Sequence, residues 1–273
     1  MYELKMGLLL YTCVLMALLT LLYRTSSVAR YYLKFIFFGI SSCLLASAPI
    51  PLMLRRPRDP RNGLIPAHGI RLACRLIGVT TSLEGHENIV KDSGCVILMN
   101  HQSMLDLLIL AELWPALDNC TVISKKEILY FQPFGLAAWL WGTIFIDRVK
   151  REHAQAAVNK TGETIRTRKA RVLMFPEGTR NNKETLLRFK KGAFHVALAS
   201  KCPIQPVVVN RYRFLGKHRF DDGHLRIKIL PPISTEGYTV ENMQELMDKT
   251  YKIMAQEVEV LTKEVDVGKK KKD

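Results

Sequence analysis

The sequence predicts an α/β domain, in which helices cover the faces of a sheet, with two apolar segments in front of it. From about residue 82, short β-rich runs alternate with longer stretches of helical pattern, which is typical of such a sheet. We expect strands at residues 95–99, 121–124, 143–147, 171–175, 204–209 and 225–230. We expect helices at residues 105–113, 152–168, 186–200 and 240–263.

Two uncharged apolar runs precede this domain, at residues 6–23 and 35–54. The first narrowly reaches the roughly 20 residues that a helix needs to cross the hydrocarbon core of a bilayer. A cleaved signal peptide is its alternative, although the flanking basic charge is weak and no clear cleavage site follows. The second run contains Pro49 and Pro51, which interrupt a helix late, so it either spans the bilayer or enters and returns.

The chain divides into membrane-anchoring segments at residues 1–61, a main domain at 62–264 and a basic tail at 265–273. Basic residues that flank a membrane segment stay on the cytosolic side. Four arginines follow the second apolar run: Arg55, Arg56, Arg58 and Arg61. We therefore expect the main domain on the cytosolic face, although basic residues between the two runs weaken this signal.

A third uncharged stretch, at residues 128–146, also has the hydropathy of a membrane span. It separates two polar motifs, at residues 100–106 and 175–180, that we expect to form one site. A single crossing would put these motifs on opposite sides of the membrane. Pro133 and Gly135 indicate instead a loop, a buried helix and then a strand, which could also line an apolar channel.

The 273-residue chain carries 40 Lys and Arg against 25 Asp and Glu, a formal charge of +15. This excess suits an anionic partner, such as a nucleic acid, an anionic membrane surface or a phosphorylated small molecule. We expect no nucleic-acid partner, because no binding module is recognisable and the N-terminus is apolar. The six cysteines form no CxxC pair and the histidines show no ligand spacing, which argues against a metal site. A GxSxG elbow, a P-loop and a GxGxxG motif are also missing from the sequence.

The run NHQSMLD at residues 100–106 follows an apolar strand and opens a helix. In one regular helix His101 and Asp106 would lie about 140° apart, so they can pair only if His101 precedes the helix and turns back. Ser103 is a candidate N-cap at that boundary. A histidine held by a carboxylate is oriented as a general base requires. Alternatively, Ser103 and Asp106 form a capping box and His101 is an ordinary turn residue.

The run FPEGTR at residues 175–180 ends another strand with a turn. Gly178 permits a positive φ and close approach of a ligand to the backbone. Thr179 and Arg180 offer donors suited to a phosphate. A surface turn with a solvated arginine is the alternative.

Three further runs carry weaker signals. GTIFIDR at residues 142–148 places Arg148 at a strand end, where ligands collect in α/β sheets. KKGAF at residues 190–194 could meet a phosphate through its two lysines, or it could be a solvated basic face. CPIQPV at residues 202–207 predicts a structural strand, with Pro203 at its start and Pro206 at an edge or bulge.

Together these motifs resemble those of the glycerolipid acyltransferase family, specifically the 1-acyl-glycerol-3-phosphate acyltransferases. Residues 100–106 look like the family's NHxxxxD motif, and residues 175–180 like its FPEGTR motif. Residues 142–148 and 203–207 look like its second motif and its proline motif, so the resemblance covers roughly residues 82–230. It implies the family's mixed sheet flanked by helices, and the motif residues look most like the lysophosphatidic acid branch.

The resemblance implies an enzyme that moves an acyl group from acyl-CoA to lysophosphatidic acid and makes phosphatidic acid at the lipid bilayer. Acyl-CoA is a substrate, so no cofactor and no metal are expected. His101 would be the general base on the sn-2 hydroxyl, and Asp106 would hold it. The implied phosphate-binding set is Arg148, Glu177, Gly178, Thr179 and Arg180. Possible contacts with acyl-CoA or phosphate are Asn100, Lys190 and Lys191.

Three alternatives remain open. The acceptor could be glycerol 3-phosphate or another lysophospholipid, the protein could bind acyl-CoA or anionic lipid without catalysis, or it could hydrolyse the thioester. KKKD at residues 270–273 resembles a dilysine retrieval signal of endoplasmic reticulum membrane proteins, and a basic tail on anionic lipid fits equally well. The glycosylation sequons at Asn119 and Asn159 must be unmodified if the domain is cytosolic.

Overall fold

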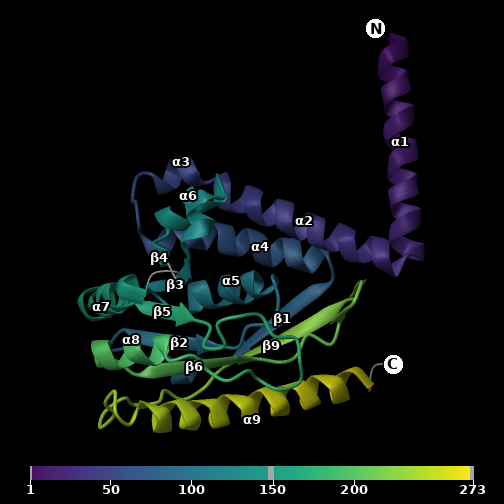
Figure 1. Cartoon of the computed structure of the whole chain (residues 1–273). Helices are drawn as coiled ribbons and strands as arrows, with labels where there is room; N and C mark the ends of the chain where they lie inside the picture. The colour runs from purple at the N-terminus through teal and green to yellow at the C-terminus, as the bar shows by residue number, and fades with distance from the viewer. Residues whose placement is uncertain (1, 147–150, 271–273) are drawn as a thin grey trace.

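The computed structural model describes residues 2–146 and 151–270 and confirms the α/β fold (Figure 1). Within these residues, seven strands form one mixed sheet in the order β1-β9-β6-β2-β5-β3-β4. The strands are β1 (Val79–Glu84), β2 (Cys95–Met99), β3 (Cys120–Lys125), β4 (Ile144–Ile146), β5 (Arg171–Met174), β6 (Ile204–Val209) and β9 (Gly223–Ile229). All neighbours run parallel except β6 and β9, which are antiparallel. A short hairpin of β7 (Leu215–Gly216) and β8 (Arg219–Phe220) lies outside this sheet.

Helices cover both faces of the sheet (Figure 1). α4 (Leu64–Leu76) and α5 (Asp106–Ala116) pack on one face, and α7 (Arg151–Arg168), α8 (Gly192–Ser200) and α9 (Met243–Lys270) on the other. The central strand β2 is buried throughout, and its alternate residues serve the two cores. Ile97 faces the core with α4 and α5, whereas Leu98 faces the core with α8 and α9.

Residues 128–146 form the loop, helix and strand that the sequence predicts. The 3-10 helix η3 (Lys126–Tyr130) leads into α6 (Phe134–Leu140), whose apolar residues are largely buried, and then into β4. This third apolar stretch is therefore part of the domain. Two other short 3-10 helices, η1 (Pro60–Gly63) and η2 (His86–Asn88), connect larger elements.

The two N-terminal apolar runs form α1 (Tyr2–Thr25) and α2 (Ser27–Ser47), followed by the single turn α3 (Ile50–Met53). α1 projects away from the domain (Figure 1), whereas α2 packs on α4 and β8. The buried residues of α2 follow a spacing of four and so form one face: Lys34, Phe38, Ser42 and Ala46. Both helices are long and apolar enough to cross a membrane, which suggests membrane association.

Two helices, α8 and α9, differ from their predicted bounds. α8 begins at Gly192 and not at residue 186, because the preceding segment is held in a loop by the side chain of Glu177, which accepts from the Leu187 N–H. α9 continues through Lys270, so the expected tail boundary at residue 265 falls inside a helix. Ion pairs of its last turns, Arg226 with Glu264 and Arg213 with Asp266, attach this end of α9 to the domain.

The prediction that Pro206 lies at an edge is wrong, because β6 is an interior strand between β9 and β2. The carbonyl of Pro206 accepts from the Leu230 N–H, so the ring nitrogen of the proline faces the same neighbour. The antiparallel ladder with β9 begins only at Val207. Pro206 therefore occupies the position where no ladder donor is needed.

Candidate active site

Two of the predicted motifs meet at one edge of the sheet. β2 and β5 are parallel neighbours, so residues 100–106 and 175–180 leave the sheet at the same side. Ligands of open α/β sheets bind at the carboxyl ends of the strands. The backbone of Asn181 donates to the carbonyl of His101 at 2.8 Å, which joins the two loops directly. β4, which holds residues 144–146 of the run at 142–148, ends at the same edge, and Arg148 lies outside the described residues.

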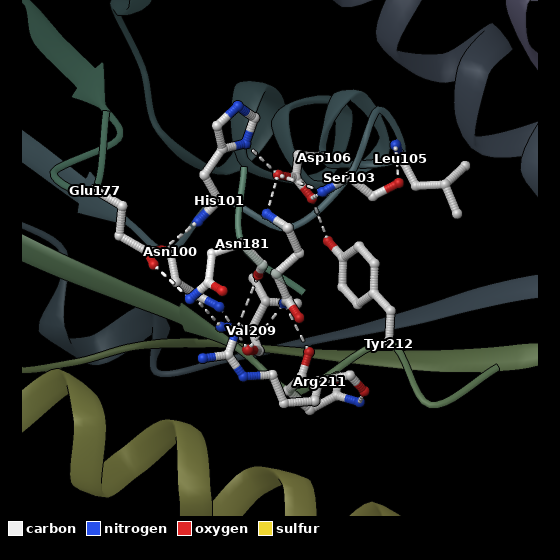
Figure 2. Close-up of polar contacts among 12 residues, drawn as sticks. Asn100, His101, Ser103, Leu105, Asp106, Glu177, Asn181, Val209, Arg211 and Tyr212 are labelled. Atoms are coloured by element: carbon white, nitrogen blue, oxygen red, sulfur yellow. Dashed lines mark hydrogen bonds and ion pairs between the residues drawn. The ribbon is translucent and has the colours of Figure 1, made fainter. Parts of the chain in front are cut away.

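His101 and Asp106 pair, because His101 precedes the helix and its ring turns back toward the first turn of α5. The ring nitrogen Nδ1 lies 2.5 Å from Asp106 Oδ2. A carboxylate can only accept, so Nδ1 carries the proton and Nε2 presents a lone pair. Figure 2 shows Nε2 pointing away from Asp106. The ring also stacks on Phe175 at a centroid distance of 3.9 Å, which fixes its plane.

The carboxylate of Asp106 also ties down the loop that carries the histidine. Oδ2 accepts from the Gln102 N–H at 2.8 Å, and both oxygens are 3.3 Å from the Ser103 nitrogen. Asp106 therefore pairs with His101 and also accepts from backbone N–H groups, but the full capping box is not formed. Ser103 is not the N-cap of α5, which begins at Asp106; its hydroxyl accepts instead from the Leu105 N–H within a preceding turn.

Glu177 is buried, and only 1% of its surface is exposed. Its Oε1 accepts from the His101 N–H at 3.0 Å. Its Oε2 accepts from the Asn181 side chain at 3.0 Å (Figure 2). The same oxygen accepts from the Leu187 N–H at 2.8 Å. Protein donors thus occupy both carboxylate oxygens, and the expected phosphate contact of Glu177 stays a prediction. In the described structure Glu177 holds the two motif loops together.

Asn100 is also buried, and its amide is fully used between strands. It donates to the carbonyl of Val209 at 3.0 Å and accepts from the N–H of the same residue at 2.9 Å. This pair joins the end of β2 to the end of β6 (Figure 2). The expected contact of Asn100 with acyl-CoA or phosphate stays a prediction, while the structure shows it linking two strands.

Of the other predicted phosphate ligands, those that the structure describes lie on the surface. Gly178 adopts φ +72°, and it, Thr179 and Arg180 are exposed. Lys190 is exposed too, and its aliphatic stem packs beside Gly178. Lys191 is exposed at the start of α8. Among the ion pairs of the described residues, none joins Arg180 to a carboxylate.

A cavity of about 810 Å³ opens beside the histidine. His101, Asp106 and Arg180 contribute polar groups to its wall. Most of the wall is apolar and comes from α2, α4, α5, β3, η3 and α6, with members such as Phe38, Ile70, Leu110, Val122, Phe134 and Trp141. A basic imidazole nitrogen, an arginine and an apolar chamber thus share one space. This combination can bind a molecule that has an anionic head and a long apolar tail, and deprotonate a hydroxyl between them.

Residues after β6 complete the site, although none of them belongs to a motif that the sequence predicts. Tyr212 donates from its hydroxyl to Asp106 Oδ1 at 2.6 Å. Arg211 is buried and donates to the backbone carbonyls of Asn181 and Glu184; burial lowers the pKa of its guanidinium. β6 is parallel to β2, so its end lies at the same sheet edge. That position was the available signal, since three polar or aromatic residues follow a strand directly.

Comparison with known proteins agrees with this architecture. Residues 81–210 match the Acyltransferase protein family. The 1-acyl-sn-glycerol-3-phosphate acyltransferase alpha of Mus musculus is 38% identical over 83% of this chain and 80% of its own length. The beta enzyme of Homo sapiens is 32% identical over 87% of this chain and 86% of its own length. The crystal structure of the LPA acyltransferase PlsC from Thermotoga maritima has the same fold, with a TM-score of 0.65, 22% identity and coverage of 85% and 96%.

The α/β fold with its motif loops at the strand ends therefore defines an acyltransferase. More narrowly, sequence identity over most of its length shows that the chain belongs to the 1-acyl-sn-glycerol-3-phosphate acyltransferase family.

Proposed function

We propose that this enzyme transfers a fatty acyl group from acyl-CoA to the sn-2 hydroxyl of lysophosphatidic acid and so makes phosphatidic acid. The observation that carries the proposal is the placement of His101. Its Nδ1 is held by Asp106, and its ring lines the same apolar cavity as Arg180. The names of the two relatives described above support lysophosphatidic acid as the acceptor.

In this mechanism His101 is the general base. Its Nε2 removes the proton of the sn-2 hydroxyl while that oxygen attacks the carbonyl carbon of the thioester. The new C–O bond forms and the C–S bond breaks. The departing thiolate takes the proton from the imidazolium, so free CoA leaves and His101 is neutral again. Such general-base catalysis contributes roughly 10²–10⁴-fold, and Asp106 supports it by holding the tautomer.

The phosphate of the acceptor would bind at the FPEGTR turn. Arg180 offers a planar pair of donors, and Gly178 lets the phosphate approach the backbone. Thr179 and Lys190 lie beside them, while Lys191 and Arg148 remain proposed contributors on sequence alone. A fixed phosphate holds the sn-2 hydroxyl near His101, and such positioning can account for several kcal/mol of the barrier, of order 7–11 in favourable cases.

The acyl chain would enter the apolar cavity. A volume of about 810 Å³ lies within the range of roughly 300–1,000 Å³ that is typical of ligand sites. Part of its wall comes from α2, a helix suited to contact with lipid. An acyl chain can then pass between bilayer and site with little exposure to water.

We place the enzyme at the endoplasmic reticulum membrane with its domain on the cytosolic face. The arginines of residues 55–61 favour this orientation, and the sequence at residues 270–273 supports the compartment. α2 has one face packed on the domain, and its outer face is apolar, which fits a helix that lies at the membrane with one side in lipid.

Acceptor competition tests the proposal. The purified protein in detergent receives oleoyl-CoA with lysophosphatidic acid, glycerol 3-phosphate or lysophosphatidylcholine, and the lipid products are separated. We expect phosphatidic acid formation to exceed the other products at equal acceptor concentrations. Free oleate formed without acceptor consumption would identify a hydrolase. Turnover of another acceptor in preference to lysophosphatidic acid would contradict the proposed substrate.

A further inference from the structure

Tyr212 holds the carboxylate of Asp106 from a part of the chain far from the NHxxxxD motif. Its hydroxyl lies 2.6 Å from Oδ1, whereas His101 Nδ1 lies 2.5 Å from Oδ2. The three side chains therefore form a continuous row, Tyr212–Asp106–His101 (Figure 2). Among the described residues, the other donors to Asp106 are the backbone N–H groups of Gln102 and Ser103.

The phenol of Tyr212 is well suited to act as a fixed donor. The residue is 8% exposed, and its ring stacks on Phe214 at a centroid distance of 5.8 Å. Burial, and after it the negative charge of Asp106, raise the pKa of Tyr212 well above its ordinary value. The hydroxyl therefore keeps its proton and donates a hydrogen bond to the carboxylate. A hydrogen bond to a charged acceptor in a buried place is stronger than one between neutral groups.

The backbone around Tyr212 is fastened from three directions. The N–H of Arg211 donates to Thr262 Oγ1 of α9 at 3.0 Å, and its guanidinium donates to the carbonyls of Asn181 and Glu184. The side chain of Asn210 accepts from the Arg226 N–H of β9 at 2.7 Å. The backbone beside the phenol is thus held by α9, by β9 and by the loop after the FPEGTR turn. Gln102, in the loop that carries His101, also donates from its side chain to the Asn210 carbonyl at 2.9 Å.

Without the phenol, Oδ1 of Asp106 would keep only the long contact of 3.3 Å with the Ser103 nitrogen. The carboxylate could then turn about its Cβ–Cγ bond, which is a soft torsion for aspartate. Oδ2 would spend less time aimed at Nδ1 of His101. The ring would lose its fixed orientation, and with it the direction of Nε2.

We propose that Tyr212 is a positioning residue for acyl transfer: its hydroxyl fixes Asp106 Oδ1, so that Oδ2 stays directed at His101 Nδ1 and Nε2 is presented to the acceptor hydroxyl. This role rests on the proposed function, because it acts through the base of that reaction. A purely structural tyrosine would fill the same space and satisfy its hydroxyl without any effect that depends on Asp106.

The test is Tyr212→Phe, which keeps the ring in the core and removes one oxygen. We expect kcat for phosphatidic acid formation to fall about tenfold, the size expected for one hydrogen bond to a charged group. KM for both substrates should stay within about twofold. Tyr251→Phe is the matched control, because that hydroxyl donates to the carbonyl of Leu186 and touches neither His101 nor Asp106. Melting temperatures of both variants report on folding.

Two further variants separate positioning from packing. In an Asp106→Asn background, Tyr212→Phe should change the residual rate by less than about twofold, since coupled residues are non-additive. Replacement of Tyr212 by 4-aminophenylalanine restores a donor at the same position and should recover much of kcat, even if the Phe variant is less stable.

Three results would overturn the role of Tyr212 while the wild-type protein remains active. They are an unchanged kcat in Tyr212→Phe, an equal loss in the Asp106→Asn background, and no recovery with the amino analogue. If the wild-type protein itself made no phosphatidic acid, the proposed function would fail, and this role would fail with it.

Discussion

The ammonium of Lys34 lies 2.8 Å from Oδ1 of Asp222, and this ion pair ties α2 to the turn between β8 and β9. The Lys34 side chain is 1% exposed, whereas that of Asp222 is 81% exposed. The ammonium also lies 5.1 Å from the ring centroid of Phe220. Because α2 forms part of the cavity wall, the pair helps to hold that wall in place.

Asp222→Ala should destabilise the protein more than Lys34→Met does. Removal of the carboxylate leaves a buried ammonium unpaired, at a cost of about 1–3 kcal/mol. Methionine in place of Lys34 removes the buried charge, and the exposed aspartate is then solvated by water. We expect a melting temperature lower by roughly 5 °C for Asp222→Ala in detergent. Asp221→Ala is the control, since its partner Arg219 is on the surface. Equal melting temperatures for the two Asp variants would argue against the role of this pair.

Arg180→Ala should weaken the binding of lysophosphatidic acid selectively. Loss of a bidentate, charge-assisted contact with the phosphate should raise KM for this acceptor about 10–100-fold, with KM for oleoyl-CoA changed less than about threefold. Arg180→Lys should be intermediate, because the point charge remains without the fork. Arg168 is an exposed arginine at the end of α7, just before β5 begins and so away from the motif loops. Arg168→Ala should behave like wild type. A rise in KM for oleoyl-CoA alone would instead assign Arg180 to the CoA phosphates.

Alkylation of Cys43 should block the acyl chain. All six cysteines are described, and Cys43 is the one that lines the cavity. Burial raises the pKa of Cys74, Cys95 and Cys120 to about 12, which makes these thiols poor nucleophiles at neutral pH.

The measurement is inactivation by N-ethylmaleimide. Palmitoyl-CoA should protect the enzyme, and free CoA should not. Cys43→Ser should resist the reagent, whereas Cys13→Ser, which lacks the exposed thiol of α1, should stay sensitive. Inactivation of Cys43→Ser at the wild-type rate would contradict the proposal that the acyl chain binds in this cavity.

Neither glycosylation sequon should carry a glycan. A cytosolic domain never meets the glycosylation machinery, and Thr121 of the first sequon is buried in β3, where its hydroxyl donates to the Gly142 carbonyl. Endoglycosidase H treatment of microsomal protein should leave its mobility unchanged, with a secreted glycoprotein from the same cells as positive control. A mobility shift abolished by Asn159→Gln would place the domain in the lumen.

The sheet was readable from the sequence where strands are buried on both faces. CVILM at residues 95–99 is continuously apolar, and all of β2 is buried. β1 was missed because it is an edge strand with partly exposed polar residues such as Thr80 and Thr81. α4 was missed because Pro66 and Gly69 look like helix breakers. Pro66 falls in the first turn, where its missing N–H costs nothing.

The site was readable only where its residues share a motif. His101 and Asp106 are five residues apart, and their spacing suggested the pair. Tyr212 is 106 residues from Asp106, so no local pattern links them. Glu177 was placed in the site for its motif, but burial decides its role, and burial depends on how Leu187 and Asn181 fold around it. Such partners can be identified only when the order of the strands in the sheet is known.

The central claim is that His101 is the base of an acyl transfer to lysophosphatidic acid. Its most direct test is the formation of CoA and phosphatidic acid from oleoyl-CoA and lysophosphatidic acid by the wild-type protein, His101→Ala and His86→Ala. His86 is an exposed histidine that follows β1, on the side of the sheet where β2 and β5 begin. Its replacement should leave the activity unchanged. We predict wild-type activity for His86→Ala and a loss of about 10²–10⁴-fold or more for His101→Ala. Equal phosphatidic acid formation by His101→Ala would contradict the account.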